Sequence, residues 1–379
     1  MTGFCISFCI LHGPSLRSAG YSISLPSLLT VLRMKFKLRR VSLALGILVS
    51  GILCALPACA QEKKFLATTI AFYNVENLFD TIDDPNTNDA EFLPGGSNRW
   101  TSQRYQAKLS NMARVIAGIG SELVAGGPAI IGLSEIENRQ VLEDLINTPP
   151  LKGLGYDIVH YDSPDRRGVD VGLLYKPSVF KVTNSTSNRL YMPNRTDFFS
   201  RDQLVVTGEL DGDLISVIVN HWPSRRSGPE YREEAARLSR QLSDSLMKAH
   251  RNAKIFIMGD LNDDPTDRSV ARVLGAKGKP GDVRKGDLFN PMWQLFRDGI
   301  GSLAYRDAWN LFDQIIISEA VLNAGKGWKF HKAKVYNEKF LIQKDGPYAG
   351  YPFRTFAGGA YAGGYSDHFP VYLFLIKEK

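Results

Sequence analysis

The segment IFIMGDLNDDPTD (residues 255–267) gathers oxygen-bearing side chains directly after an apolar run. Asp260, Asn262 and Asp264 occupy alternate positions, and this spacing also opens a calcium loop of the EF-hand type. Such a loop needs a glycine at its sixth position and a glutamate at its twelfth. Pro265 replaces the glycine and no carboxylate follows at the twelfth position, so the sequence excludes an EF-hand.

A strand and a short helix account for these side chains better. Asp260 and Asn262 follow the apolar run two residues apart, so they point to one face and into a site at the strand end. Asp264 and Asp267 are expected to cap a short helix beginning near Pro265. Asp263 is expected to be a solvated carboxylate, and so is Glu137, which follows Glu135 in another motif.

Polar residues also stand at the ends of five other apolar runs. These are Asn74 and Glu76, Glu135, His221, Asp313, and the pair Asp367 and His368. Each alone is typical of a helix cap, a solvated turn or a satisfied core histidine. Polar residues at the ends of all six runs would be an improbable coincidence without a shared role, and functional groups are often placed at the ends of rigid strands. The sequence therefore predicts one site built from six strand ends.

The residue types favour phosphate chemistry with a hard cation. Carboxylate and amide oxygens suit Mg²⁺ or Mn²⁺, which also take water and phosphate oxygens as ligands. A histidine backed by an aspartate can move a proton or polarise a phosphoryl oxygen. Two arginine pairs on loops bounded by Gly or Pro are candidate phosphate ligands, against the alternative of ordinary surface charge. They are Arg166, Arg167, Arg225 and Arg226.

The elements that must position these residues are short strands with helices between them. Apolar, β-branched runs predict strands at 65–75, 129–136, 155–162, 169–176, 203–210, 214–222, 254–261, 312–319 and 370–376. Helical patterns cover Trp100–Ile119, Gln140–Asn147 and Pro229–Asn252. The polar, Gly-rich stretches 81–99 and 275–306 are expected to be surface loops. Mixed hairpins and helices indicate sheets covered by helices, an α/β or α+β layered fold.

The first 60 residues have the character of a leader. Met34–Arg40 is basic, Val41–Ala58 is apolar, and a small-residue cleavage site precedes Gln61, as in a secretory signal whose translation starts at Met34. The segment LPAC, ending at Cys59, is similar to a bacterial lipobox, so secretion and lipid anchoring through Cys59 both stay open. Residues 61–379 are expected to form one domain, a monomer working outside the cytoplasm, either secreted, periplasmic or anchored to the envelope.

Removal of this leader changes the composition. All four cysteines (Cys5, Cys9, Cys54 and Cys59) lie in it, so the remaining chain has no disulfide framework and no thiolate chemistry. Six of the 46 Lys and Arg residues and none of the 39 Asp and Glu residues lie there as well. The rest of the chain is therefore nearly neutral, and an anionic substrate must be held by local charge.

The motifs resemble those of the endonuclease/exonuclease/phosphatase superfamily, which has the deoxyribonuclease I fold. The resemblance runs from NVENLFD (74–80) through SEIEN, NHWPSR, GDLN and WNLFDQI to SDHFPV (366–371) in the family's order. GDLN and SDH are its most specific parts. The motif sequences YNVENLFD and NHWPSRR are most similar to those of a bacterial secreted or envelope subgroup. It implies a four-layer sandwich of two mixed β-sheets packed face to face with helices outside.

The same resemblance implies roles for the candidate residues. Glu135 would be the main metal carboxylate, supported by Asn74, Glu76 and Asp367. Asp260 and Asn262 would orient the attacking water and contact the phosphate. His368, with Asp313 as its partner, would be the general base or would polarise the phosphate, and His221 would act as the second histidine.

The implied activity is hydrolysis of a phosphodiester by metal-assisted in-line attack of water, with DNA or RNA as possible substrates and no organic cofactor. Where the family's repair enzymes place a tyrosine, this chain has Arg166 and Arg167, which argues against repair of abasic sites. A phosphomonoesterase and a phospholipid or sugar-phosphate diesterase stay open as alternatives, because a duplex-binding protein usually has a basic stripe. A non-catalytic surface-binding protein is the third class, disfavoured because every motif position is filled.

Overall fold

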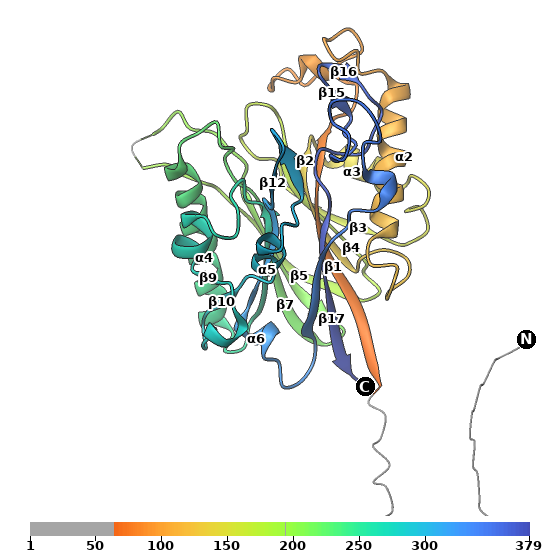
Figure 1. Cartoon of the computed structure of the whole chain (residues 1–379). Helices are drawn as coiled ribbons and strands as arrows, with labels where there is room; N and C mark the ends of the chain where they lie inside the picture. Colours follow the sequence, from red (N-terminus) through yellow and green to blue (C-terminus); the bar gives the residue numbers. More distant parts are fainter. Residues whose placement is uncertain (1–63, 194) are drawn as a thin grey trace, which may run out of the picture. The chain divides into compact units, whose positions relative to one another are not determined.

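The computed structural model describes residues 64–193 and 195–379 (Figure 1). The described residues form one compact unit. The expectations for the leader, including its start at Met34 and the lipobox at Cys59, lie outside the described residues. Within the described residues, none of the helices combines the length and apolar character needed to cross a membrane.

Two mixed β-sheets form the centre of the unit. The first has six strands in the order β14-β17-β1-β2-β4-β3: β1 (Phe65–Leu78), β2 (Ile130–Ile136), β3 (Asp157–His160), β4 (Asp170–Tyr175), β14 (Lys329–Val335) and β17 (Val371–Glu378). The second has seven in the order β5-β6-β7-β8-β13-β10-β9: β5 (Phe180–Asn188), β6 (Gln203–Leu210), β7 (Asp213–His221), β8 (Lys254–Asp260), β9 (Ala276–Lys277), β10 (Leu288–Phe289) and β13 (Asp313–Ser318). Parallel pairs β1–β2 and β7–β8 lie among antiparallel neighbours, so both sheets are mixed.

The sheets pack face to face and approach each other closely at Gly132 of β2. A Cβ added there would meet the side chains of Met258 and Val219 from the second sheet at 2.7 and 3.0 Å. Only glycine lets the two sheets approach so closely at this position.

Helices cover the outer faces (Figure 1). α2 (Ser102–Gly118) and α3 (Arg139–Ile146) lie on the first sheet, whereas α4 (Pro229–Ala249) and the π-helix η2 (Ser269–Leu274) lie on the second. Strand β8 shows the layering by its alternation: Phe256 and Met258 join the core between the sheets, and Ile255 and Ile257 join a separate cluster under α4. The predicted four-layer sandwich is therefore confirmed.

Short elements complete the fold. They are the helices η1 (Ala90–Phe92), η3 (Pro280–Asp282), α5 (Met292–Arg297), α6 (Glu319–Leu322) and η4 (Lys339–Leu341), and the hairpins β11 (Leu303–Tyr305) with β12 (Ala308–Asn310) and β15 (Phe356–Ala357) with β16 (Ala360–Tyr361).

The nine predicted strands and three predicted helices are all present, with ends shifted by a few residues. The edge strands β5 and β14 were not predicted, because their polar and basic residues hide the alternation of an exposed edge. The loop prediction for 275–306 is wrong in part. That stretch holds β9, β10, α5 and β11, and Leu288 and Met292 in it are fully buried.

Candidate active site

Three strands of the second sheet place their polar residues in one row. His221 of β7 lies opposite Asp260 of β8 in their parallel pairing, and Asp313 of β13 lies opposite Asp260 on its other side. All three side chains are buried. Because strand register decides which residues are neighbours, this row joins side chains that are up to 92 residues apart, from His221 to Asp313.

The first sheet contributes through irregular strand ends. Glu76 and Glu135 both have left-handed backbones, with φ of 51° and 62°. A non-glycine residue in this region carries a cost on the order of 1–3 kcal/mol and persists only where its surroundings hold it. Here Glu76 N–H donates to Asn74 Oδ1 at 3.0 Å, and Asn77 N–H donates to Glu135 Oε2 at 3.1 Å. A hydrogen bond thus joins the strained ends of β1 and β2.

Asp260 is the centre of the cluster. Its Oδ2 accepts from Asn74 Nδ2 at 3.0 Å, and its Oδ1 accepts from Asn262 N–H at 2.9 Å. The same Oδ2 lies 3.8 Å from Nε2 of His221 and 3.9 Å from Nε2 of His368. Burial raises the pKa of Asp260 to about 6, although the positive charge of His368 opposes the rise.

His368 and Asp313 form a buried dyad. His368 Nδ1 lies 2.6 Å from Asp313 Oδ2, which also accepts from Ser302 Oγ. Burial by itself disfavours the imidazolium, but Asp313, Asp367 and Asp260 outweigh it and hold the pKa of His368 well above its usual value. The dyad leaves Nε2 facing Asp260.

His221 has the opposite electrostatics. Its Nε2 lies 3.8 Å from Glu135 Oε1, while its buried Nδ1 has no hydrogen-bond partner among the described residues. Burial, together with the cations of Arg201 and Arg167, holds the pKa of His221 well below its usual value. The site therefore pairs a neutral histidine with a charged one, an arrangement suited to acid and base roles.

Asn262 and Asp367 complete the set of predicted residues at the cluster. Asn262 is buried, has a left-handed backbone with φ of 50°, and donates from Nδ2 to Trp222 O at 3.0 Å. Asp367 Oδ1 lies 3.9 Å from His368 Nε2. The structure thus brings together all nine predicted catalytic and metal-ligating residues.

Three residues that were not predicted from the sequence also belong to this site. Arg354 contacts Asp367 Oδ2 at 2.5 Å and lies 3.7 Å from Glu76 Oε1. Lys108 is buried behind Glu76, and the buried Arg201 donates to His221 O and Trp222 O. Lys108 could have been recognised from the sequence, because it interrupts the apolar stripe of its helix. Nothing in the sequence distinguishes Arg201 or Arg354 from surface arginines.

The four predicted phosphate-binding arginines have different surroundings. Arg167 is exposed, with Nη2 3.9 Å from Glu135 Oε1, so it borders the cluster. Arg166 is exposed beside it, and its guanidinium lies over Phe199. Arg226 is exposed on the loop after β7. Arg225 instead bonds carboxylates that hold the next loop, at 3.0 Å to Asp264 and 2.7 Å to Asp267. Its charge is already paired, so the geometry does not favour Arg225 as a phosphate ligand.

The remaining acidic residues of the opening motif correct two predictions. Asp264 caps no helix: its Oδ1 accepts from Leu311 N–H at 2.7 Å, and the helix η2 that follows has no side-chain cap. Asp263 is buried against Arg232 and Ser269, and Glu137 is buried with its Oε2 accepting from Asp80 N–H. Neither is solvated, because the Asp263 carboxylate bonds the side chains of Arg232 and Ser269 and the Glu137 carboxylate bonds a loop backbone, partners that the sequence pattern does not reveal.

The donor set fits a hard divalent cation. Glu76, Glu135 and Asp367 supply carboxylate oxygens, Asn74 supplies an amide, and no cysteine is present in the described residues. Asp260, Asp313 and His368 also offer three ligand atoms within 4.8 Å of one another. Since His368 Nδ1 already bonds Asp313, we interpret these three as the acid–base group beside the cation site.

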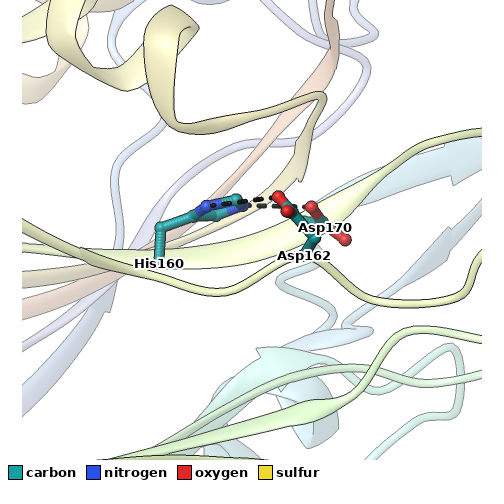
Figure 2. Close-up of side chains that lie close together, drawn as sticks. All are labelled: His160, Asp162 and Asp170. Carbon is teal, nitrogen blue, oxygen red and sulfur yellow. Dashed lines mark hydrogen bonds and ion pairs between the residues drawn. The ribbon is translucent and has the colours of Figure 1, made fainter. Parts of the chain in front are cut away.

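A second cluster does not have the geometry of a metal centre (Figure 2). His160 Nε2 lies 3.0 Å from Asp170 Oδ2, but Asp162 lies at the other ring nitrogen, 3.9 Å from Nδ1. One ion cannot bind both nitrogens of one imidazole. Asp170 Oδ1 accepts from both N–H and Oγ of Ser163, so this group anchors the loop that carries Arg166 and Arg167.

Comparison with known proteins places this arrangement in a family. The model of the endonuclease/exonuclease/phosphatase family matches residues 69–377. No curated protein matches the chain at a significant level. Among solved structures, truncated TDP2 from Caenorhabditis elegans is similar, with a TM-score of 0.51 and 14% identity over 82% of this chain and 98% of that chain.

Two structures from Bacteroides thetaiotaomicron are also similar. One is an endonuclease/exonuclease/phosphatase family protein with a TM-score of 0.49 and 17% identity over 84% of this chain and 97% of that chain. The other is a mannosyl-6-phosphatase with a TM-score of 0.48 and 16% identity over 81% and 99%. The family match spans nearly the whole described unit and agrees with the fold and the motif order. The chain belongs to the endonuclease/exonuclease/phosphatase family of phosphoester-hydrolysing enzymes.

Proposed function

We propose that this protein is a divalent-metal-dependent phosphodiesterase that cleaves its substrate by in-line attack of water on phosphorus. One observation carries the proposal. Two histidines of opposite charge preference, His221 and His368, flank the same oxygen of Asp260 at 3.8 and 3.9 Å. A carboxylate held between two imidazoles suits a displacement in which the carboxylate activates water and the imidazoles contact the phosphoryl and leaving oxygens.

Mg²⁺ or Mn²⁺ is the cofactor that the donor set supports, held by Glu135, Glu76 and Asp367 with Asn74. When bound, such an ion neutralises phosphate charge and polarises the phosphoryl oxygen. No organic cofactor is needed for this reaction.

The protein side chains divide the remaining work. Asp260 is held by Asn74 and Asn262 so that one carboxylate oxygen can orient the water and receive its proton. His368, fixed by Asp313, directs its Nε2–H to a phosphoryl oxygen as negative charge develops there. His221 faces the cluster from β7 and serves the leaving-group side.

Surfaces flanking the cluster favour a diester over a monoester. On one side, the guanidinium groups of Arg166 and Arg189 lie 5.1 and 5.6 Å from the exposed ring of Phe199. On the other, Trp309 is 37% exposed and stacks on Phe369, the residue after His368. Two arginines with an aromatic ring near one part of the cluster, and a second exposed aromatic ring beside His368, suit an extended substrate such as single-stranded DNA or RNA.

A substrate panel tests the proposal. The protein is assayed with Mg²⁺, Mn²⁺ or EDTA on linear and plasmid DNA, RNA, bis-p-nitrophenyl phosphate, p-nitrophenyl phosphate and sphingomyelin. We expect metal-dependent hydrolysis of the diesters and its loss in Asp260→Ala and His368→Ala. Faster turnover of p-nitrophenyl phosphate than of any diester would replace the proposal with a phosphomonoesterase, and selective hydrolysis of sphingomyelin with a phospholipid diesterase.

We also infer that the enzyme works outside the cytoplasm. The support is the signal-like leader before Gln61 and its lipobox-like end at Cys59. Mass spectrometry of the protein from a bacterial host distinguishes the routes. A free N-terminus at Gln61 indicates secretion, a lipid mass on Cys59 that disappears in Cys59→Ser indicates anchoring, and an intact leader contradicts both.

A further inference from the structure

Lys108 is a buried lysine that the proposed mechanism does not use. It lies in the middle of α2, its side chain is only 1% exposed, and its neighbours on the helix include Tyr105, Leu109 and Met112 of the core. Lysine is among the residues that are almost never fully buried without a partner. A structural role as core filler would be served better by leucine or methionine, so the ammonium requires an explanation.

The two groups within hydrogen-bond distance of the Lys108 ammonium are both neutral. Nζ donates to Thr355 Oγ1 at 2.6 Å and to the backbone oxygen of Tyr365 at 2.5 Å. Among the described residues no carboxylate lies within ion-pair distance of Nζ. Burial lowers the pKa of Lys108 to about 8, and the charges of Glu76, Asp367 and Glu135 oppose this effect from further away. The lysine therefore sits behind the carboxylate cluster rather than in it.

Both partners of Lys108 belong to the segment that presents two of those carboxylates. Thr355 N–H donates to Glu76 Oε2 at 2.6 Å. Tyr365 directly precedes Ser366, whose hydroxyl donates to Asn74 O at 2.7 Å, and Asp367 follows. One ammonium thus joins the two ends of the segment 355–365 behind the cluster.

We propose that Lys108 is a positioning residue that pre-organises Glu76 and Asp367 for the divalent cation by fixing Thr355 and Tyr365. This inference rests on the cation site of the proposed function and adds a residue outside it. The cation would meet carboxylates already held in place, so less conformational freedom is lost on binding. Removing the lysine frees the segment and weakens cation binding.

The test compares the unaltered protein with Lys108→Met, which keeps the length and apolar stem but removes the ammonium. Binding of MnCl₂ is measured by calorimetry, and thermal unfolding is measured in EDTA. We expect Mn²⁺ binding in Lys108→Met to be at least about tenfold weaker, as for other groups that orient metal ligands. We expect the unfolding temperature in EDTA to change little, because removal of the buried charge offsets the loss of its two hydrogen bonds.

Lys176→Met is the matched control. Lys176 is a half-buried lysine that also donates to backbone oxygens, those of Gly126 and Gly127, but it lies away from the cluster. Its replacement should leave Mn²⁺ binding unchanged whatever it does to stability. Thr355→Val provides a second variant if Lys108→Met does not fold. It removes the hydroxyl partner while keeping the N–H that bonds Glu76, and it should also weaken Mn²⁺ binding.

The outcomes separate the possibilities. Unchanged or tighter Mn²⁺ binding in Lys108→Met and Thr355→Val overturns the inference while leaving the cation site intact. Weaker binding in Lys176→Met to the same extent also overturns it, since the effect would then reflect general destabilisation. Failure of the unaltered protein to bind Mn²⁺ contradicts the cation site itself, and with it both proposals.

Discussion

The contact between His368 and Asp313 joins the two sheets of the sandwich. His368 stands before β17 of the first sheet, Asp313 begins β13 of the second, and Nδ1 lies 2.6 Å from Oδ2. The other ring nitrogen faces Asp260, which lies opposite Asp313 in the pairing of β8 with β13. The two aspartates are therefore neighbours across the strands but serve opposite edges of one imidazole.

Asp313→Asn should lower turnover of bis-p-nitrophenyl phosphate by about 10²-fold or more, the range for losing a positioned acid–base group. The amide neither carries the negative charge that holds the His368 proton nor fixes the same tautomer. The measurement is kcat against pH, and we expect the activity of the variant to fall off at lower pH than that of the parent. Asp162→Asn is the control, because its side chain is 91% exposed beside a different histidine. Equal kcat in both variants would contradict the role of the dyad.

Arg167→Ala and Arg225→Ala should have different effects. Arg167 is exposed and approaches carboxylates only at 3.7 Å (Asp165) and 3.9 Å (Glu135), so its loss should raise KM about tenfold and leave the unfolding temperature unchanged. Arg225 bonds Asp264 and Asp267, so its loss should lower stability by on the order of 1 kcal/mol. Diester kinetics and thermal unfolding on both variants check this. A large KM effect from Arg225→Ala at unchanged stability would restore it as a phosphate ligand.

Divalent cation should stabilise the folded protein. A ligand that binds only the folded state at 100 times its dissociation constant adds about 2.7 kcal/mol. The unfolding temperature should therefore rise with MnCl₂ and return on addition of EDTA. Glu135→Gln should abolish most of the rise, because it removes the proposed main metal carboxylate. A rise of equal size in Glu135→Gln would place the cation elsewhere.

Glu137 should make stability depend on pH. Burial raises its pKa from 4.5 to about 8, although Asp80 N–H opposes the rise. Between these values the folded state binds a proton that the unfolded state has lost, so this residue contributes a loss of stability as pH rises. Glu137→Gln keeps an acceptor for Asp80 and removes the titration.

The check is the unfolding temperature of both proteins in EDTA at pH 5 and pH 8.5. The decrease between the two pH values should be smaller in Glu137→Gln. Identical decreases would show that Glu137 does not titrate in this window. The conclusion concerns stability only, since Glu137 lies outside the proposed catalytic set.

Much of the fold follows from local pattern. A continuous apolar run such as Ile255–Met258 marks a strand buried on both faces, and Asp211 and Gly212 mark the hairpin between β6 and β7. The edge strand β5 lacks such an apolar run, because it pairs with a neighbouring strand on one side only and most of its residues are exposed or half-buried. Its assignment needed the pairing with β6.

The acidic residues of the motif at 260–267 have two different roles, which their even spacing in the sequence does not reveal. Asp260 and Asn262 lie at the cluster, as their spacing after the strand suggested. Asp264 and Asp267 hold Arg225 and loop backbones instead of a helix. The partners of these two carboxylates lie up to 47 residues away, at Leu311, so no local rule identifies them.

The sequence by itself determined which residue types stand at the strand ends, and therefore the phosphate and hard-cation chemistry that they suit. Only the tertiary structure decided their neighbours: that Asp260 lies between His221 and Asp313, that Lys108 lies behind Glu76, and that Arg225 is already paired. Periodicity and capping are local properties of a chain. Register between strands and the approach of two sheets depend on how the whole core packs.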